Sequence, residues 1–360
     1  MVRVFAVEPT AVQLDWSSLP PGTHDLAAGD RTTTVVADGG PGAVVIDGLE
    51  PGTTVDVTLD GRRVTSATTL TAPPGRLLTR IATIGDLHLG ETRFGFLPTI
   101  ASNPDPAVAH PVMCTAAAID ELLAWGAELL VVKGDLAHSN RASQYELAGE
   151  LLGGLPVPTM VLPGNHDGGN HRHHDAATSL AAHGLALVED VAVMDVPGLR
   201  VVGVDTRTRT QAGTVADATA AVVEAVVGSS GGAMVVLHHQ LMTSAVPTNP
   251  PPGGPAAESR RFLDALAAAQ PASVVTSGHT HRHRARRHGP LLVTEVGSVK
   301  DYPGTWAGYL VYEGGVVQTV RRIAAPDAIR WSQRTASMFG GAWGRWSPGR
   351  LTDRCISHSW

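Results

Sequence analysis

The 360-residue sequence contains only two cysteines, Cys114 and Cys355, which excludes a fold held together by a disulfide framework. Charged residues make up only 17% of the chain, and lysine occurs only at positions 133 and 300. With a formal net charge of −6, the chain lacks the basic excess that a general nucleic-acid-binding protein carries. We therefore expect no nucleic-acid partner.

Long apolar runs are also scarce. We expect no stretch to reach the ~18 apolar residues that a membrane span requires. The apolar run at residues 2–7 is too short for a signal peptide. These observations predict a cytoplasmic location without membrane association, and they leave the oligomeric state open.

A chain of this length favours more than one domain. Residues 1–74 contain short alternating segments broken by turn residues, at 11–16, 43–46, 53–59 and 63–69. Asp60-Gly61 is a strong hairpin signal between the last two. The pattern predicts a small antiparallel β-sandwich domain over residues 1–74.

From residue 79 onward the pattern changes to alternating apolar runs and amphipathic segments. Strands are predicted at 80–85, 128–133, 157–162, 199–204, 233–237 and 272–276, and helices at 112–126, 142–152, 216–227 and 258–269. This alternation predicts an α/β fold in which helices cover the sheets. Residues 325–360 form an aromatic-rich tail that we expect to pack on this α/β domain. The alternative is that the tail covers a functional site of the domain and stacks against a ring of a bound molecule.

Five short fragments carry the chemistry. They are Gly85-Asp86-Leu87-His88, Gly134-Asp135, Gly164-Asn165-His166-Asp167, His238-His239 and Gly278-His279-Thr280-His281. Each offers the carboxylate, amide or imidazole donors that divalent transition metals accept. Most follow a short apolar run, so they stand where a buried strand would end. The sequence therefore predicts a two-metal site.

The order D-x-H, G-D, G-N-H-[DE], H, G-H-x-H resembles that of the calcineurin-like metallophosphoesterases, over residues 79–324. The resemblance implies a metallophosphoesterase fold, with two mixed β-sheets sandwiched and flanked by helices. Residues 49–57 resemble the L-x-P-G-x-x-Y-x-V segment of fibronectin type III domains, with Val55 in place of the tyrosine. Purple acid phosphatases likewise place a β-sandwich before the catalytic domain.

The resemblance also assigns roles to residues. It implies that Asp135 bridges two divalent metal ions, the first held also by Asp86, His88 and His281 and the second by Asn165, His238 and His279. It makes His166 the catalytic residue beside the leaving group. It also implies that Asp167, His138 and His239 support the ligands and the catalytic residue, and that Asp167 fixes the ring tautomer of His166. No tyrosine follows Asp135 before Tyr145, which argues against a purple iron site and leaves Mn, Fe or Zn open.

The function implied is hydrolysis of a small phosphodiester, cyclic nucleotides included, through a metal-bridging hydroxide. Three alternatives stay open: a phosphomonoesterase, since the same metals serve both reactions; a nuclease of the DNA-repair type; and a non-catalytic scaffold. The Pro/Gly-rich stretches 96–111 and 246–254 and the polar stretch 168–175 are interpreted either as walls of the substrate pocket or as surface loops.

Overall fold

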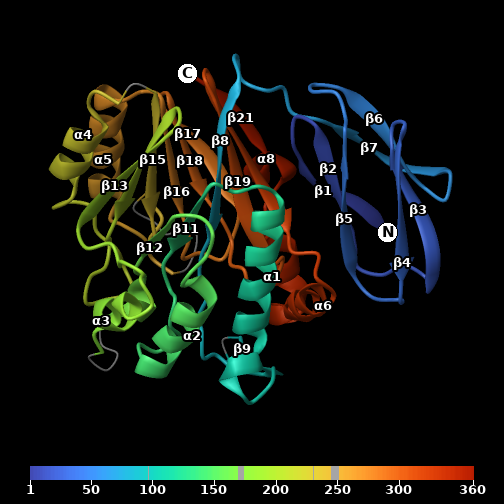
Figure 1. Ribbon diagram of the computed structural model, residues 1–360, viewed down its shortest axis with the longest axis horizontal. Coiled ribbons are helices and arrows are strands. Elements are labelled where there is room, and N and C mark those ends of the chain that lie inside the picture. Colours follow the sequence, from blue (N-terminus) through green and yellow to red (C-terminus); the bar gives the residue numbers. More distant parts are fainter. Residues whose placement is uncertain (96, 169–173, 230, 245–250) are drawn as a thin grey trace.

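The computed structural model describes residues 1–95, 97–168, 174–229, 231–244 and 251–360. Residues 1–75 form two antiparallel sheets, with strand orders β1-β2-β5 and β4-β3-β6-β7 (Figure 1, blue). The strands are β1 (Val2–Val7), β2 (Ala11–Trp16), β3 (Gly22–Ala28), β4 (Arg31–Ala37), β5 (Gly42–Asp47), β6 (Thr54–Leu59) and β7 (Arg62–Thr68). Buried side chains such as Leu14, Leu26 and Val57 fill the space between the sheets. The predicted all-β region is confirmed, whereas its relation to fibronectin type III domains stays a prediction.

The turn between β6 and β7 has the predicted form. Leu59 pairs with Arg62, and the two residues between them, Asp60 and Gly61, have φ values of 50° and 75°. Positive φ at both central positions is the conformation that joins two strands tightly without splaying them. β1, β3 and β4 were not predicted.

The next part of the chain builds two six-stranded sheets, with orders β12-β11-β8-β19-β20-β21 and β13-β14-β15-β16-β18-β17. The strands of the first are β8 (Leu77–Ile84), β11 (Leu129–Lys133), β12 (Thr159–Leu162), β19 (Thr305–Tyr312), β20 (Gly315–Arg322) and β21 (Ile356–Ser359). Those of the second are β13 (Val191–Val196), β14 (Leu199–Val204), β15 (Gly232–Leu237), β16 (Ser273–Ser277), β17 (Arg284–His288) and β18 (Leu291–Glu295). β9 (Arg93–Phe94) and β10 (Ile100–Ala101) form a small separate pair.

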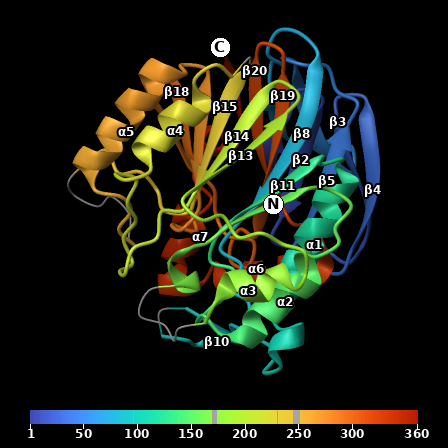
Figure 2. The same cartoon turned by 60° about the vertical axis from the view of Figure 1, so that its left-hand side comes forward.

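The two large sheets pack face to face. Val131 and Tyr309 of the first sheet share a buried cluster with Val201 and Val236 of the second. Helices cover the outer faces, with α1 and α2 against the first sheet and α4 and α5 against the second (Figures 1 and 2). The predicted α/β sandwich flanked by helices is therefore confirmed.

The main helices agree with the predicted ranges to within a few residues. They are α1 (His110–Ala124), α2 (Ala142–Leu152), α4 (Thr219–Val226) and α5 (Ala256–Ala269). α3 (Ala176–Ala181) was not predicted. Short 3-10 segments are η1 (Pro106–Val108), η2 (Asn165–Asp167) and η3 (Met338–Gly341).

Among the described residues, one segment is long and apolar enough to cross a membrane, contrary to the expectation from the sequence. It is Pro106–Ala124, 19 residues long, and it ends with α1. In the structure Cys114, Ala118 and Leu122 of α1 are buried in the core beside the first sheet. The core helix of a folded domain passes the same test of length and composition, so this observation is weak evidence for a membrane span.

The last residues are integrated into the fold. They form α6 (Pro326–Thr335), α7 (Ala342–Trp346), α8 (Leu351–Arg354) and β21. Trp331 of α6 lies in the same core cluster as α1, and β21 pairs with β20. The N-terminal sandwich is held to β20 by hydrogen bonds. The guanidinium of Arg322 donates a hydrogen bond of 2.7 Å to the carboxylate of Asp15, and the backbone of Arg322 makes two hydrogen bonds with the side chain of Gln13.

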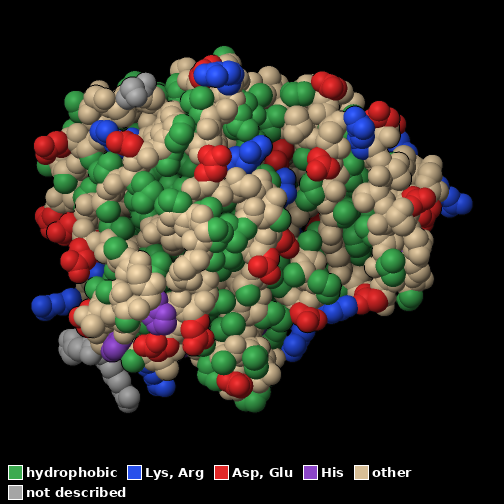
Figure 3. Space-filling model, in the orientation of Figure 1, with side chains coloured by type: hydrophobic (Ala, Val, Ile, Leu, Met, Phe, Trp, Pro, Cys, Tyr) green, Lys and Arg blue, Asp and Glu red, His purple; other side chains and the backbone are tan. Residues whose placement is uncertain are grey.

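The visible face in Figure 3 shows acidic and basic side chains scattered among apolar and neutral ones, rather than gathered by sign over one element. Such mixing agrees with the modest net charge of −6.

Candidate metal centre

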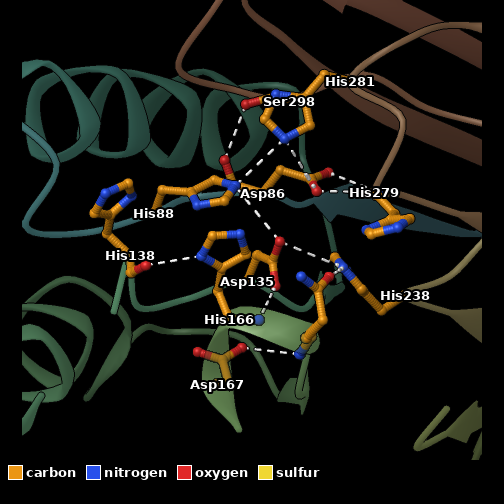
Figure 4. A network of polar contacts seen from close by, with 12 residues as sticks. Asp86, His88, Asp135, His138, His166, Asp167, His238, His279, His281 and Ser298 are labelled. Atoms are coloured by element: carbon orange, nitrogen blue, oxygen red, sulfur yellow. Dashed lines mark hydrogen bonds and ion pairs between the residues drawn. The ribbon is translucent and has the colours of Figure 1, made fainter. Parts of the chain in front are cut away.

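The five fragments lie at the carboxyl ends of five parallel-paired strands. In the first sheet β8, β11 and β12 run parallel, and they lead into Asp86, Asp135 and Asn165. In the second sheet β15 and β16 also run parallel, and they lead into His238 and His279. Ligands commonly bind at the carboxyl ends of such strands. In Figure 4 the labelled side chains from the two sheets point toward a shared centre.

One group of ligand atoms gathers around His88 and His281. Their Nε2 atoms lie 3.3 Å apart. Nε2 of His281 is 3.5 Å from Oδ1 of Asp86, and Nε2 of His88 is 3.5 Å from Oδ2 of Asp135. Asp86 and His88 are buried and His281 is nearly so. The four residues predicted for the first metal therefore meet in one place.

A second group gathers around His238. Its Nε2 lies 3.0 Å from Oδ1 of Asn165 and 3.4 Å from Oδ2 of Asp135. The ring centroids of His279 and His238 lie 5.0 Å apart. Nε2 of His279 is buried without a hydrogen-bond partner among the described residues. Oδ2 of Asp135 is thus the atom that both groups share.

The proton positions show why this arrangement fits cations. Nδ1 of His238 lies 2.8 Å from the carbonyl oxygen of Lys133, and a carbonyl only accepts, so Nδ1 carries a proton. Nε2 then points at two oxygen atoms. Burial lowers the pKa of His238, but the charge of Asp135 outweighs it and raises the pKa to about 9. An unprotonated Nε2 would face two oxygen atoms that also carry only lone pairs, so either a second proton on the ring or a bound cation is needed between them. Imidazole, carboxylate and amide donors together suit Mn, Fe or Zn.

Asp135 is the anionic centre of both groups. Burial alone would raise its pKa, but His238 and the other surrounding histidines hold the pKa well below its usual value. The carboxylate is therefore charged. A buried carboxylate facing two sets of imidazoles is suited to bridging two cations.

The backbone at these residues is in a conformation that non-glycine residues rarely adopt. φ is positive at five predicted ligands: Asp86 (55°), His88 (49°), Asp135 (49°), His279 (69°) and His281 (50°). Such residues persist only where the surroundings enforce them, and they cluster at functional sites. Nothing in the sequence pattern predicted this shared conformation.

Two motif glycines permit close approach between the fragments. A Cβ on Gly134, whose φ is 87°, would lie 2.7 Å from the backbone nitrogen of Gly164. A Cβ on Gly278 would lie 2.7 Å from Oδ2 of Asp86. The glycines of G-D and G-H-x-H are thus required by packing around the two aspartates.

His166 lies in the short helical turn η2, directly after Asn165. Its backbone N–H donates a hydrogen bond of 2.9 Å to Oδ1 of Asp135, and its ring Nδ1 lies 2.7 Å from the carbonyl oxygen of His138. Because a carbonyl oxygen only accepts, that contact places a proton on Nδ1. The ring meets that of His88 edge-on, with centroids 4.6 Å apart. His166 is therefore beside the predicted metal ligands.

Asp167 was expected to fix the ring tautomer of His166, and in this detail the prediction is wrong. Its carboxylate does not orient the ring of His166; it accepts the backbone N–H groups of Leu136, Ala137 and Gly164 and the hydroxyl of Tyr145. The tautomer of His166 is fixed instead by the carbonyl of His138. Asp167 thus ties the turn after β12 to the turn after β11, which carries Asp135.

The other two supporting residues lie close to the centre. His138 stacks 5.9 Å from His166, and burial lowers its pKa to about 4. His239 contacts Thr206 through Nδ1 at 2.8 Å, while its Nε2 is buried without a partner in the described ranges. Ligand atoms of His238, His239 and His279 lie within 4.8 Å of one another. His239 is therefore also in reach of a cation.

Several residues at the centre were not predicted. Asp301 lies 2.5 Å from Nδ1 of His281, and Ser298 donates to the backbone carbonyl of Asp86. A cavity of about 270 Å³ opens beside the ligands. Its walls include Glu91, Gln211, Pro251, Lys300 and Trp343 together with the predicted histidines. These residues come from loops, or in the case of Trp343 from the short helix α7, without a recognisable local pattern.

The three stretches predicted to be loops are only partly covered by the described residues. Residues 96, 169–173 and 246–250 lie outside the described residues, so most of stretches 168–175 and 246–254 is not placed. Pro251 lines the cavity, which puts the end of the last stretch at the centre.

Comparison with known proteins gave a family match. The model of the family described as calcineurin-like phosphoesterase matches residues 79–283. No curated protein matches significantly. Among solved structures, a dimetal phosphatase from Danio rerio is 12% identical, with a TM-score of 0.49, 69% of this chain covered and 97% of that one. The purple acid phosphatase PPD1 from yellow lupin (Lupinus luteus) is 12% identical, with a TM-score of 0.48 and coverage of 89% and 71%. Both scores are below 0.5, so the family match carries the argument.

Proposed function

Because this chain belongs to the calcineurin-like phosphoesterase family and is a metal-dependent phosphoester hydrolase, we propose that its substrate is a small phosphodiester, cyclic nucleotides included. The observation that carries the proposal is the position of Asp135. Its Oδ2 lies 3.5 Å from Nε2 of His88 and 3.4 Å from Nε2 of His238, so one carboxylate serves two groups of ligands.

The residues for each cation follow from this geometry. Asp86, His88 and His281 would hold one ion, and Asn165, His238 and His279 the other, with Asp135 common to both. A pair of divalent ions activates water and neutralises phosphoryl oxygens, which is the chemistry that phosphoester hydrolysis requires. The donor set supports Mn, Fe or Zn and does not select among them.

His166 is the residue proposed to exchange a proton with the leaving group. Its Nδ1 is held by the carbonyl of His138 at 2.7 Å, so the ring cannot turn without losing that bond. Its backbone is fixed by Asp135. The residue lines the same cavity as the metal ligands. An imidazole held in this way beside the predicted metal ligands suits general acid–base catalysis.

The size of the cavity supports a small substrate. Its volume of about 270 Å³ lies near the lower end of the range for small-molecule pockets.

A cytoplasmic location is part of the proposal. It is supported by the two buried thiols of Cys114 and Cys355, which form no disulfide.

A substrate panel tests the proposal. Purified protein would be reloaded with Mn(II), Fe(II) or Zn(II) and offered cyclic nucleotides, bis-aryl phosphates, aryl monoesters and duplex DNA. We expect the diesters to be hydrolysed fastest, and the same protein kept in a chelator to be inactive. Faster turnover of monoesters would show a phosphomonoesterase, and preferential cleavage of DNA a nuclease. No turnover with any metal would refute the proposal.

A further inference from the structure

We propose that Trp343 and Lys300 form a phosphate-binding subsite on the wall of the metal-centre cavity, where each donates to a phosphoryl oxygen of the substrate. The inference rests on the proposed function and deepens it, because it assigns substrate contacts to residues outside the metal-ligating fragments. Both residues line the cavity of about 270 Å³ together with Asp135 and His166.

Trp343 presents a hydrogen-bond donor that lacks an acceptor. It lies in α7, and its indole nitrogen is buried with no hydrogen-bond partner in the part of the chain that the structure describes. An indole N–H can only donate, and buried donors are almost always paired. Because the side chain lines the metal-centre cavity, an oxygen atom of a bound ligand is the natural acceptor.

The position of Trp343 is fixed by its neighbours. Its carbonyl accepts the backbone N–H and the hydroxyl of Ser347, and the carbonyl of Ser347 in turn accepts the N–H of His283. His283 stands two residues after the predicted ligand His281. The tail is thereby tied to the loop that carries two predicted ligands, and the backbone that bears the indole is held in place before a substrate arrives.

Lys300 supplies a cation on the same wall. Only 2% of the residue is exposed, and its ammonium group is paired with the carboxylate of Glu91. Its backbone carbonyl accepts the indole N–H of Trp331 at 2.7 Å, which anchors the residue. An ammonium has three N–H donors, and Glu91 is the one acceptor found for it among the described residues. Nζ also lies 4.7 Å from the centroid of the Phe94 ring. Glu91 and this ring account for two of the three donors, so the third can be donated to a ligand in the cavity.

The chemistry of these two donors favours an oxyanion. A buried ammonium and a buried N–H are not satisfied by an apolar group, but both are satisfied by the charged oxygens of a phosphoryl group. Their place beside the predicted metal ligands puts them where a phosphoryl group would lie during hydrolysis. The tail therefore contributes to substrate binding in addition to packing on the core.

Orthophosphate binding provides the test. Isothermal titration of the Mn(II)-loaded protein should show that W343F, which keeps an aromatic ring but removes the N–H, binds orthophosphate about tenfold more weakly. W346F is the matched control, since Trp346 lies in the same helix, 5.4 Å from Trp343, and is absent from the cavity lining. Metal content and thermal midpoint would be measured for each variant.

Weaker binding by W343F alone would support the subsite. Equal binding by W343F and wild type, or equal weakening by W346F, would overturn it. Lys300 is tested with the double variant E91Q/K300M, which avoids leaving the Glu91 carboxylate buried without its ammonium partner. We expect about tenfold weaker binding here as well, and unchanged binding would remove Lys300 from the subsite.

Failure of the subsite differs from failure of the proposed function. A wild type that hydrolyses phosphodiesters while all variants bind orthophosphate equally refutes only the subsite. A wild type that neither hydrolyses phosphoesters nor binds orthophosphate refutes the function on which the subsite rests.

Discussion

Oδ2 of Asp301 lies 2.5 Å from Nδ1 of His281, and the opposite ring nitrogen of His281 faces Asp86 at 3.5 Å. A carboxylate in this position fixes the ring and makes its free nitrogen a better metal ligand. We predict that Asp301→Asn lowers metal affinity about 10- to 100-fold, measured by competitive titration against a chelating dye. Asp327→Asn, on an exposed residue paired with Arg330, is the control. Unchanged affinity in the Asp301 variant would remove it from the metal centre.

Asp135→Ala should abolish metal binding and turnover together. The carboxylate faces both groups of imidazoles, so its loss removes an anionic ligand from each cation and the screening between them. Elemental analysis after reloading and desalting measures the retained metal. Near wild-type metal content would contradict the bridging role.

His166→Ala should retain the metals but lose about 10²- to 10⁴-fold in turnover. The residue lies beside the ligands, with its Nδ1 bonded to a carbonyl. The loss should be greatest for substrates with poor leaving groups, because those depend most on proton donation. A series of aryl phosphodiesters with leaving groups of graded pKa measures this dependence. A loss that is equal across the series would argue against His166 as the acid.

Glu91 should make the stability of the protein acid-sensitive. Burial raises its pKa, but Lys300 and His110 outweigh burial and lower it from 4.5 to about 2. The depressed native pKa means that the unfolded state takes up the proton first. Its stabilisation, about 3 kcal/mol, is therefore present above pH 4.5 and is lost as pH falls toward 2.

Urea unfolding of wild type and Glu91→Gln, both kept metal-free, measures this contribution. The difference in free energy of unfolding should be largest near pH 6 and shrink as the pH falls to 3. Glu146→Gln, on an exposed residue, is the control for replacing a carboxylate by an amide. A difference for Glu91→Gln that stays constant with pH would refute the assignment.

Asp15→Ala should destabilise the protein by about 3–5 kcal/mol, since it leaves the charge of Arg322 buried without its partner. The two side chains are fully buried and 2.7 Å apart, between the N-terminal sandwich and β20. Urea unfolding provides the measurement, and Asp30→Ala, at an exposed position, provides the control. A change below about 1 kcal/mol, the value of an exposed pair, would show that the pair does not fasten the sandwich.

The fragments that form the candidate metal centre could be identified from the sequence because each is local and each follows a strand. Asp86 and His88, for example, are two residues apart and directly follow β8. Asp301, Lys300 and Trp343 could not be predicted. They belong to loops or short helices without apolar periodicity, and only the tertiary fold brings them to the cavity.

Some strands were missed for a similar reason. β17 has the sequence RARRH and β21 the sequence ISHS, neither of which resembles a strand by composition. Each becomes a strand because it lies at the edge of a sheet and pairs with one neighbour, β18 and β20 respectively. Tertiary pairing outweighs local preference at such positions.

The pairing of β8 with β19 has a consequence for how the protein folds. Ala82 lies opposite Gly308, so the middle of the first sheet joins segments separated by most of the chain. Contacts of such long range slow folding, because loop closure costs entropy before the contact is gained. During synthesis β8 must wait for β19, and His279 and His281 precede β19 in the chain. All seven predicted ligands can therefore come together only late in the folding of the protein.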